Sequence, residues 1–193
     1  MRFVCVLAVL LLAGCHPADK GPARPAEAAA KPSPSARPKP VNKAVLDADG
    51  ITFDSRAGKT REINFGATRA EVDAMAERFF GKPDELSENA ECGAGPMQFS
   101  RYGPLTMNFQ NGKLVGWLAR EGPEVVTSDG IRPGAFMRDL RIARSARMIE
   151  DSTLEGEFGY LAADGHTIGG FATGEGRDAK IASLYAGTNC FFR

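Results

Sequence analysis

Few side chains in this chain have the types and spacing that hydrolytic chemistry needs. Ser152 follows Asp151, and His166 is the only histidine after residue 42. A Ser–His–Asp site would need Ser152 and His166 to meet in the fold, and Ser152 lacks the glycine-flanked turn that exposes a catalytic serine. Glu155 and Glu157 form a carboxylate pair, but side chains two apart in an extended segment share one face, which is commonly solvated. The residues favour a chain without a catalytic site.

Metal and cofactor sites are also not indicated. Cys92 and Cys190 stand 98 positions apart, and with a single histidine in this part of the chain they make no cluster of zinc ligands. The glycine-rich segment 91–96 lacks the strand, lysine and helix of a phosphate-binding loop. We therefore expect neither a metal nor a cofactor.

The most conspicuous charged group is a row of arginines spaced by three: Arg138, Arg141, Arg144 and Arg147. If a helix extends over all four, they form a stripe that could meet carboxylates or phosphates on a partner. The alternative is a solvated helix face that is partly paired with acidic neighbours such as Asp139, Glu150 and Asp151. We keep the four arginines as candidate binding residues.

A helix over residues 69–80 is the clearest element that could position such groups. Thr68 and Glu71 have the spacing of a capping box, in which each side chain bonds a free backbone N–H at the helix start. Apolar residues then recur at the spacing of one buried face: Val72, Met75, Ala76, Phe79 and Phe80. Gly81 and Pro83 predict the helix end, because glycine supplies a left-handed stop and proline cannot continue the helix.

A β-hairpin over residues 105–119 is the second clear element. Asn111-Gly112 predicts a two-residue turn, because both residues tolerate a positive φ. With regular pairing, five apolar residues share the buried face: Leu105, Met107, Phe109, Leu114 and Leu118. Trp117 then falls on the opposite face beside Val115, where a neighbouring element covers it or a partner contacts it. We keep Trp117 as a candidate binding residue.

The second half of the chain resembles the first. Counterparts recur 68 residues later: Ile63 and Ile131, Gly66 and Gly134, Glu71 and Asp139, Val72 and Leu140, Trp117 and Tyr185. A constant offset from helix start to last strand predicts a duplicated unit, with chance similarity as the alternative. The predicted fold is a small sheet-based α+β domain over residues 43–193. It has two tandem units, about 60–122 and 128–190, each a short helical segment plus antiparallel strands.

The first fifteen residues have the pattern of an export signal. Arg2 precedes an apolar run that is too short to span a membrane and ends at Leu12-Ala13-Gly14-Cys15. This end resembles the lipobox of bacterial lipoproteins, which implies cleavage of residues 1–14 and acylation of Cys15, and several acyl chains anchor a protein stably. In such lipoproteins an Asp after the cysteine favours retention at the inner membrane, so His16 favours the outer membrane. An ordinary cleaved signal peptide is the alternative.

Residues 15–42 predict a disordered tether after the lipidated cysteine. Seven of the chain's twelve prolines lie there, with no aromatic residue, so the segment cannot bury a core. Its basic excess either attracts anionic lipid or polymer or only adds solubility. After residue 42 lie 18 of the 24 basic and 22 of the 24 acidic residues, a net charge of −4. This acidic balance argues against nucleic acid as a partner.

The cysteines fit an exported protein. If Cys5 leaves with the signal and Cys15 is acylated, then Cys92 and Cys190 are the remaining thiols. An even pair in an oxidising compartment predicts a disulfide, which would join the two predicted units. Two buried free cysteines or a redox-active thiol remain as alternatives, although there is no CxxC motif.

Residues 63–72 (INFGATRAEV) and 80–83 (FGKP) resemble the start of the repeat in BamE-like and beta-lactamase-inhibitor-protein-like lipoproteins. In that group a glycine-led helical segment ends near a Gly-x-Pro and leads into a small antiparallel sheet. Its members bind other proteins: one is an accessory part of outer-membrane protein assembly, and another clamps an enzyme with the concave face of two tandem sheets. The resemblance implies a protein-binding role and identifies no binding residue.

These features together predict a non-enzymatic lipoprotein, anchored in the outer membrane with its domain in the periplasm. Its expected partners, besides the membrane, are an envelope protein or a cell-wall polymer, in a binding or envelope-assembly role. An inhibitor of a secreted enzyme is the alternative, and it would need a concave, aromatic-rich sheet face. An envelope hydrolase is less favoured, since it would need a pocket that joins His166 to Ser152 or to an acidic pair.

Overall fold

The computed structural model describes residues 42–55 and 57–192, all within one unit of the chain, Lys39–Arg193. The predicted signal segment, Cys15 and the predicted tether up to residue 41 lie outside the described residues. Among the residues that are described, no helix is long and apolar enough to cross a membrane.

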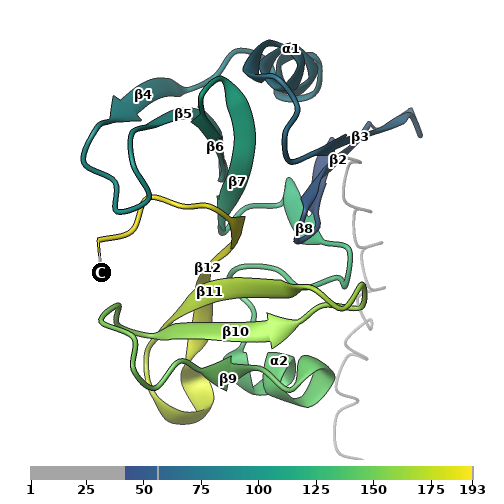
Figure 1. Cartoon of the computed structure of the whole chain (residues 1–193). Helices are drawn as coiled ribbons and strands as arrows, with labels where there is room; N and C mark the ends of the chain where they lie inside the picture. The colour runs from purple at the N-terminus through teal and green to yellow at the C-terminus, as the bar shows by residue number, and fades with distance from the viewer. Residues whose placement is uncertain (1–41, 56, 193) are drawn as a thin grey trace, which may run out of the picture. The chain divides into compact units, whose positions relative to one another are not determined.

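Two β-sheets, two α-helices and one 3-10 helix make up this part of the chain (Figure 1). Sheet A has the strand order β3-β2-β1-β8, with bounds β1 (Lys43–Leu46), β2 (Gly50–Asp54), β3 (Thr60–Asn64) and β8 (Val125–Thr127). Its strands are antiparallel except for the parallel pair β1 and β8. The helices are α1 (Arg69–Phe80), α2 (Met137–Arg144) and η1 (Gly176–Asp178).

Sheet B has eight antiparallel strands in the order β4-β5-β6-β7-β12-β11-β10-β9. Their bounds are β4 (Glu85–Asn89), β5 (Met97–Tyr102), β6 (Leu105–Gln110), β7 (Lys113–Arg120), β9 (Arg147–Met148), β10 (Glu157–Leu161), β11 (Thr167–Thr173) and β12 (Lys180–Gly187). Each half of the sheet runs in chain order from its edge to the centre, where β7 pairs with β12. The chain forms a sheet-based α+β domain, as predicted.

Helix α1 begins and ends where the sequence predicts. The Thr68 hydroxyl accepts from the Glu71 N–H at 3.3 Å, and the Glu71 carboxylate accepts from the Thr68 N–H at 3.0 Å. Gly81 ends the helix at a φ of 85°. Val72 and Ala76 are fully buried, and the other predicted apolar residues of this face pack against the core at its edge. The capping box and the buried face are therefore confirmed.

The hairpin of β6 and β7 contains a β-bulge at Val115. Regular pairing from the Asn111-Gly112 turn would place Asn108 opposite Val115, but Asn108 pairs with Gly116. One extra residue in β7 moves each later side chain of this strand to the other face of the sheet.

The bulge reverses the predicted places of Trp117 and Leu118. Trp117 is 0% exposed, and its Nε1 donates to the Asp47 carbonyl in the β1–β2 turn at 2.7 Å. Leu118 is half-buried and lies on the opposite face. The predicted outward position of Trp117 is therefore wrong, and Trp117 is not a surface binding residue.

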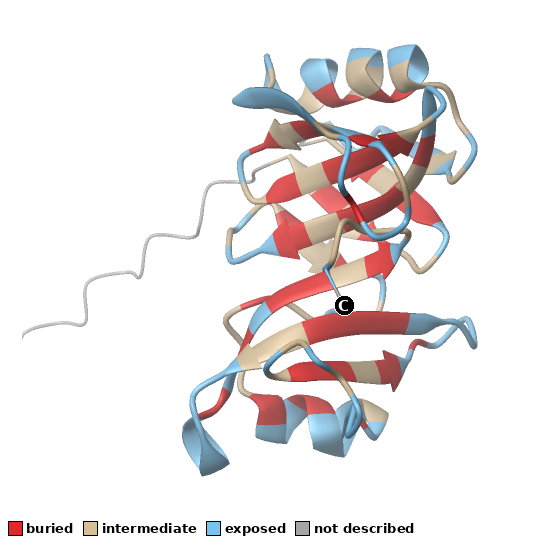
Figure 2. Cartoon of the chain, turned by 60° about the vertical axis from the view of Figure 1, so that its left-hand side comes forward, coloured by how far each residue is buried: buried red, intermediate tan, exposed pale blue. Residues whose placement is uncertain are grey.

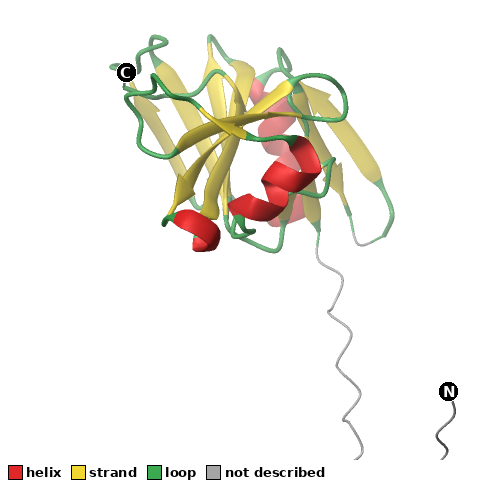
Figure 3. Cartoon of the chain, turned by 90° about the horizontal axis from the view of Figure 1, so that it is seen from below, coloured by secondary structure: helices red, strands yellow, loops and turns green. Residues whose placement is uncertain are grey.

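One hydrophobic core lies on the face of sheet B that the helices and sheet A cover (Figure 3). Its large, fully buried side chains come from both sheets and from α2, and include Phe53, Trp117, Leu140 and Phe158. The opposite face of sheet B is here called the outer face. Strand alternation and pairing place eight residues on it: Phe99, Arg101, Thr106, Asn108, Leu118, Arg120, Phe171 and Tyr185.

Tyr160 buries its hydroxyl close to the Thr127 side chain, but no described residue meets full hydrogen-bond geometry with it. Burial raises the pKa of Tyr160 to about 12, and the nearby Thr127 side chain offsets only part of this shift. Because an exposed tyrosine in the unfolded chain ionises near pH 10, the folded state loses stability as the pH rises from about 10 to 12. We expect Tyr160→Phe to keep or raise the free energy of unfolding at pH 7, by up to about 1 kcal/mol, and to reduce the alkaline loss.

Urea unfolding at pH 7 and at pH 10.5 checks this expectation. Tyr102→Phe is the matched control at pH 7, because the Tyr102 hydroxyl donates to the Asp73 carboxylate at 3.4 Å and its removal should lower stability there; burial raises the pKa of Tyr102 as well, so this variant should also reduce the alkaline loss. A loss of more than about 1 kcal/mol in Tyr160→Phe at pH 7 would show that the Tyr160 hydroxyl has a partner.

Candidate functional site

Cys92 and Cys190 form the predicted disulfide, with Sγ atoms 2.06 Å apart and Cα atoms 4.8 Å apart. Cys92 lies in the loop between β4 and β5, at one edge of sheet B, and Cys190 follows β12 at its centre. The bond therefore fixes residues 188–192, here called the C-terminal segment, against the outer face (Figure 2).

Polar and aromatic contacts hold the C-terminal segment on the sheet. The Asn108 amide donates to Asn189 Oδ1 at 2.7 Å and to the Thr188 carbonyl at 3.1 Å. Three rings with centroids 4.9–5.5 Å apart form a cluster: Phe171, Tyr185 and Phe191. The segment is thus attached to both halves of the sheet.

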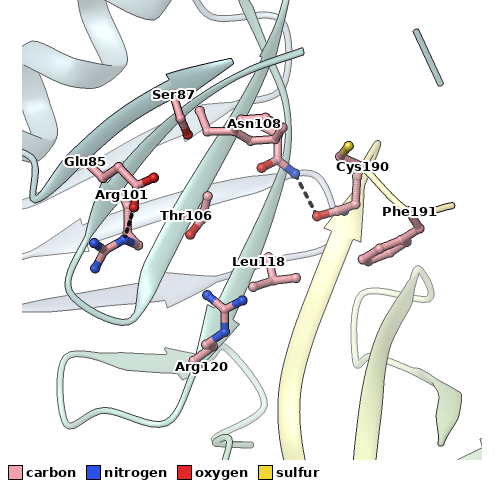
Figure 4. A pocket seen from close by; sticks show the side chains of 11 residues that line it. Glu85, Ser87, Arg101, Thr106, Asn108, Leu118, Arg120, Cys190 and Phe191 are labelled. Atoms are coloured by element: carbon pink, nitrogen blue, oxygen red, sulfur yellow. Dashed lines mark hydrogen bonds and ion pairs between the residues drawn. The ribbon is translucent and has the colours of Figure 1, made fainter. Parts of the chain in front are cut away.

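A pocket of about 310 Å³ lies on the outer face between strands β4–β7 and the C-terminal segment (Figure 4). Its apolar lining is Phe99, Leu118 and Phe191, its polar lining includes Ser87, Thr106 and Asn108, and its charged lining is Glu85, Arg101 and Arg120. We refer to it as the outer-face pocket. Ligand sites combine apolar walls with a few placed polar groups, and this pocket contains both kinds, with a larger polar share than most.

Only part of the charge in the outer-face pocket is balanced within the fold. Arg101 Nε lies 3.2 Å from the Glu85 carboxylate, and another nitrogen of the same guanidinium lies 3.7 Å from Asp84. Arg120 makes no ion pair with any described residue. Its side chain points toward Thr106 and Leu118 (Figure 4).

The structure brings together some of the residues considered for hydrolysis and separates others. The Ser152 hydroxyl donates to Glu157, which is 1% exposed and also accepts from the Tyr185 hydroxyl. His166 lies beyond the far end of β10, and the four residue steps of this strand place that end about 13 Å from Glu157. Glu155 lines a different pocket, beside Arg141. Ser152 and Glu157 therefore meet, and His166 does not join them.

The four arginines do not form one stripe. Helix α2 ends at Arg144, because Ser145 adopts a left-handed conformation with a φ of 52°. Arg147 lies on strand β9, where it pairs with Gly159. The predicted extension of the helix to Arg147 is therefore wrong.

Two of these arginines are engaged within the fold. The Arg138 guanidinium lies 4.1 Å from the centre of the Phe136 ring and donates to the Arg177 carbonyl at 2.9 Å. Arg144 lies 2.7 Å from the Asp129 carboxylate, whose side chain is 1% exposed. Arg141 and Arg147 are exposed and make no ion pair with the described part of the chain, so these two of the four are available to a partner.

We expect Arg144→Met to lower the free energy of unfolding by about 2 kcal/mol, because it leaves the buried Asp129 carboxylate without a cation. The loss should stay below that of a fully buried pair, since Arg144 itself is 33% exposed and water screens it. Arg141→Met, the matched control, should change stability by less than about 0.5 kcal/mol. Urea unfolding monitored by circular dichroism measures both, and equal effects would contradict this assignment.

Two further observations concern titratable side chains of the described residues. Among the described residues, no three His, Cys, Asp or Glu side chains gather as a candidate metal site. Asp47 has a raised pKa, mainly because it is partly buried and also because Asp164 and Asp49 lie near. Neither observation adds a reactive group to the outer-face pocket.

The chain matches no family model, no curated protein and no solved structure, so the site is assigned from its own geometry. The sequence pattern gives little sign of its central residues, Leu118, Arg120 and Phe191. Leu118 occupies a predicted core position, and the other two stand at a strand end and near the chain end. These residues lie close together for two reasons. The bulge directs the side chains of Leu118 and Arg120 to the outer face, and the disulfide holds the C-terminal segment against that face.

Proposed function

We propose that this chain is a lipoprotein of the cell envelope, anchored in the outer membrane through Cys15, whose domain binds another envelope protein without catalysing a reaction. The observation that carries the proposal is the outer-face pocket, which combines apolar side chains, hydroxyl groups and the guanidinium of Arg120. A disulfide fixes one wall of this pocket, so the surface is preformed. Preformed surfaces lose less conformational entropy on binding.

The proposal includes a tandem organisation of the domain. In each half, the same three backbone hydrogen bonds join the start of the helix to the last strand. In the first half, the N–H groups of Gly66, Leu114 and Arg69 donate to the carbonyls of Leu114, Ala67 and Gly112. In the second half, those of Gly134, Ile181 and Met137 donate to the carbonyls of Ile181, Ala135 and Ala179. The last strand of each half also carries a bulge, at Val115 and at Ala182. These matches support two copies of one unit, offset by 68 residues at the helix and by 67 in the last strand.

The two proposed copies differ on the outer face. With the offset of 67, Leu118 corresponds to Tyr185, and Trp117 corresponds to Leu184 rather than to Tyr185. In the second half, Tyr185 and Phe171 pack with Phe191 into an aromatic cluster. The first half has smaller or polar side chains at these places, and there the outer-face pocket is open. The divergence of the copies thus supports a binding site in the first half.

Photo-crosslinking in intact cells tests the binding function. We expect a chain with a photoreactive phenylalanine analogue at Leu118 to give a discrete, light-dependent adduct with one envelope protein. The matched control carries the analogue at Arg61, an exposed position on β3 of sheet A. No adduct at Leu118, or the same adduct at Arg61, would overturn the proposed binding surface.

Metabolic labelling with an alkyne fatty acid tests the anchor separately. The wild-type chain should incorporate the label and sediment with the outer membrane. Cys15→Ala should lose the label and leave the membrane fraction. Labelling that persists in Cys15→Ala would contradict acylation at this residue.

Inhibition of a secreted enzyme is a second candidate function, and the aromatic content of the outer face favours it. Phe99, Phe171, Tyr185 and Phe191 lie on or against this face. If the crosslinked partner is an enzyme, titration with this chain should remove its activity at a one-to-one ratio. If the enzyme keeps its activity at a saturating concentration of this chain, then the chain binds the enzyme without inhibiting it.

A further inference from the structure

Arg120 is the cation of the outer-face pocket that the fold leaves without a counter-ion. It is the last residue of β7, where it pairs with Ser183 of β12, and its backbone N–H donates to the Pro104 carbonyl at 2.8 Å. These contacts fix the backbone from which the exposed guanidinium reaches into the pocket (Figure 4). The neighbouring Arg101 is already engaged by two carboxylates, those of Glu85 and Asp84.

Thr106, on the strand next to β7, is the hydroxyl nearer to this guanidinium, whereas Ser87 lies three strands away on β4 (Figure 4). The hydroxyls of Ser87 and Thr106 line the same pocket, and neither makes a side-chain hydrogen bond with the described residues. The Asn108 amide nitrogen is fully used by the C-terminal segment. A planar guanidinium with the Thr106 hydroxyl on the neighbouring strand matches a carboxylate, because guanidinium and carboxylate can form two parallel hydrogen bonds.

The remainder of the pocket is apolar. Phe99, Leu118 and Phe191 form walls next to the donors, so a ligand that fills the site presents an apolar group beside its anionic group. A volume of about 310 Å³ is at the lower end for ligand sites, which limits the occupant to one or two side chains. An acidic residue beside an apolar one in a peptide loop meets all three conditions.

We propose that the outer-face pocket binds an exposed loop of a partner protein. An Asp or Glu of that loop pairs with Arg120, and an adjacent apolar side chain of the loop packs against Phe99, Leu118 and Phe191. This proposal rests on the proposed protein-binding function and specifies the chemistry of the partner. Charge complementarity selects this occupant: Arg120 is the one cation of the pocket lining that makes no ion pair with a described residue, whereas a polyanionic polymer needs several cations and would meet Glu85 and Asp84.

A displayed library of random heptapeptides provides the probe. It is selected on the oxidised mature chain with Cys15→Ser, so that no lipid is present. We expect the enriched peptides to share an Asp or Glu next to Phe, Leu, Ile or Val. A synthetic peptide of that type should lose about tenfold or more in affinity when Arg120 becomes Gln, measured by fluorescence anisotropy.

Two controls make the result specific. Arg61→Gln, an exposed arginine of sheet A, should leave the affinity unchanged. Replacing the acidic residue of the peptide by its amide should cause the same loss as Arg120→Gln, and the two changes together should cause little further loss. Circular dichroism verifies that Arg120→Gln is folded, and Thr106→Val is a second variant that removes a donor from the same pocket.

The remaining outcomes each overturn the inference. They are the absence of enriched peptides, enriched peptides without an acidic residue, affinity that does not depend on Arg120, and competition of the bound peptide by purified cell-wall polymer. The photo-crosslinked adduct at Leu118 distinguishes failure of this inference from failure of the proposed protein-binding function. An adduct that persists unchanged in Arg120→Gln cells rejects the carboxylate partner and leaves protein binding in place, whereas a missing adduct in wild-type cells rejects both.

Discussion

Replacing both Cys92 and Cys190 by alanine should lower the free energy of unfolding by about 4 kcal/mol, because the bond joins residues 98 apart and its removal returns conformational entropy to the unfolded chain. This is a large share of the roughly 5–15 kcal/mol by which most domains are stable. Urea unfolding of the mature Cys15→Ser chain, with and without the double substitution, measures the difference. Far-UV circular dichroism follows the sheets.

Reduction of the wild-type disulfide supplies the control, since it breaks the same bond without changing residues 92 and 190. We expect it to lower stability by a similar amount. The double variant should also lose the Leu118 adduct, because the C-terminal segment forms a wall of the outer-face pocket. A stability loss below about 1 kcal/mol would show that Asn108 and the aromatic cluster alone fix this segment.

The features that the sequence predicts correctly depend on residues close together in the chain or on a simple count. The start of α1 depends on Thr68 and Glu71, and its end depends on Gly81, all within one short segment. The disulfide follows from two cysteines that remain once an export signal is assigned. Neither inference needs knowledge of which strands are neighbours.

The faces of β7 could not be predicted from alternation, because a bulge changes the alternation in the middle of the strand. Gly116 is the local indication of this bulge in the sequence. A Cβ on Gly116 would lie 2.3 Å from the Thr188 carbonyl oxygen, so the residue after the bulge has no room for a side chain. Glycine within a strand often marks a bulge or a close backbone approach, and here it marks both.

The outer-face pocket depends on pairing between distant segments. Its lining comes from four consecutive strands and from the chain end, and the Asn108 contact alone joins residues 80 and 81 positions apart. The arginine row misleads for a related reason. Its spacing fits a helix, but the chain leaves the helix at Ser145 to pair β9 with β10, and this pairing has no local pattern.

Trp117→Ala should lower the free energy of unfolding by about 3–5 kcal/mol, because the ring is fully buried and its loss leaves a large cavity. It also leaves the Asp47 carbonyl without the donor that links sheet B to sheet A. Leu118→Ala should cost less than about 1 kcal/mol, since Leu118 is half-buried at the outer-face pocket. Urea unfolding must be followed by circular dichroism, because Trp117 is the only tryptophan of the chain.

The comparison of these two neighbours tests the bulge directly. Regular pairing without the extra residue at Val115 would bury Leu118 and expose Trp117, so the order of the two losses would reverse. Trp117→Phe keeps one six-membered ring but removes the indole donor together with part of the ring volume, so we expect an intermediate loss of about 1–2 kcal/mol. A larger loss for Leu118→Ala than for Trp117→Ala would contradict both the register of β7 and the position of the proposed binding surface.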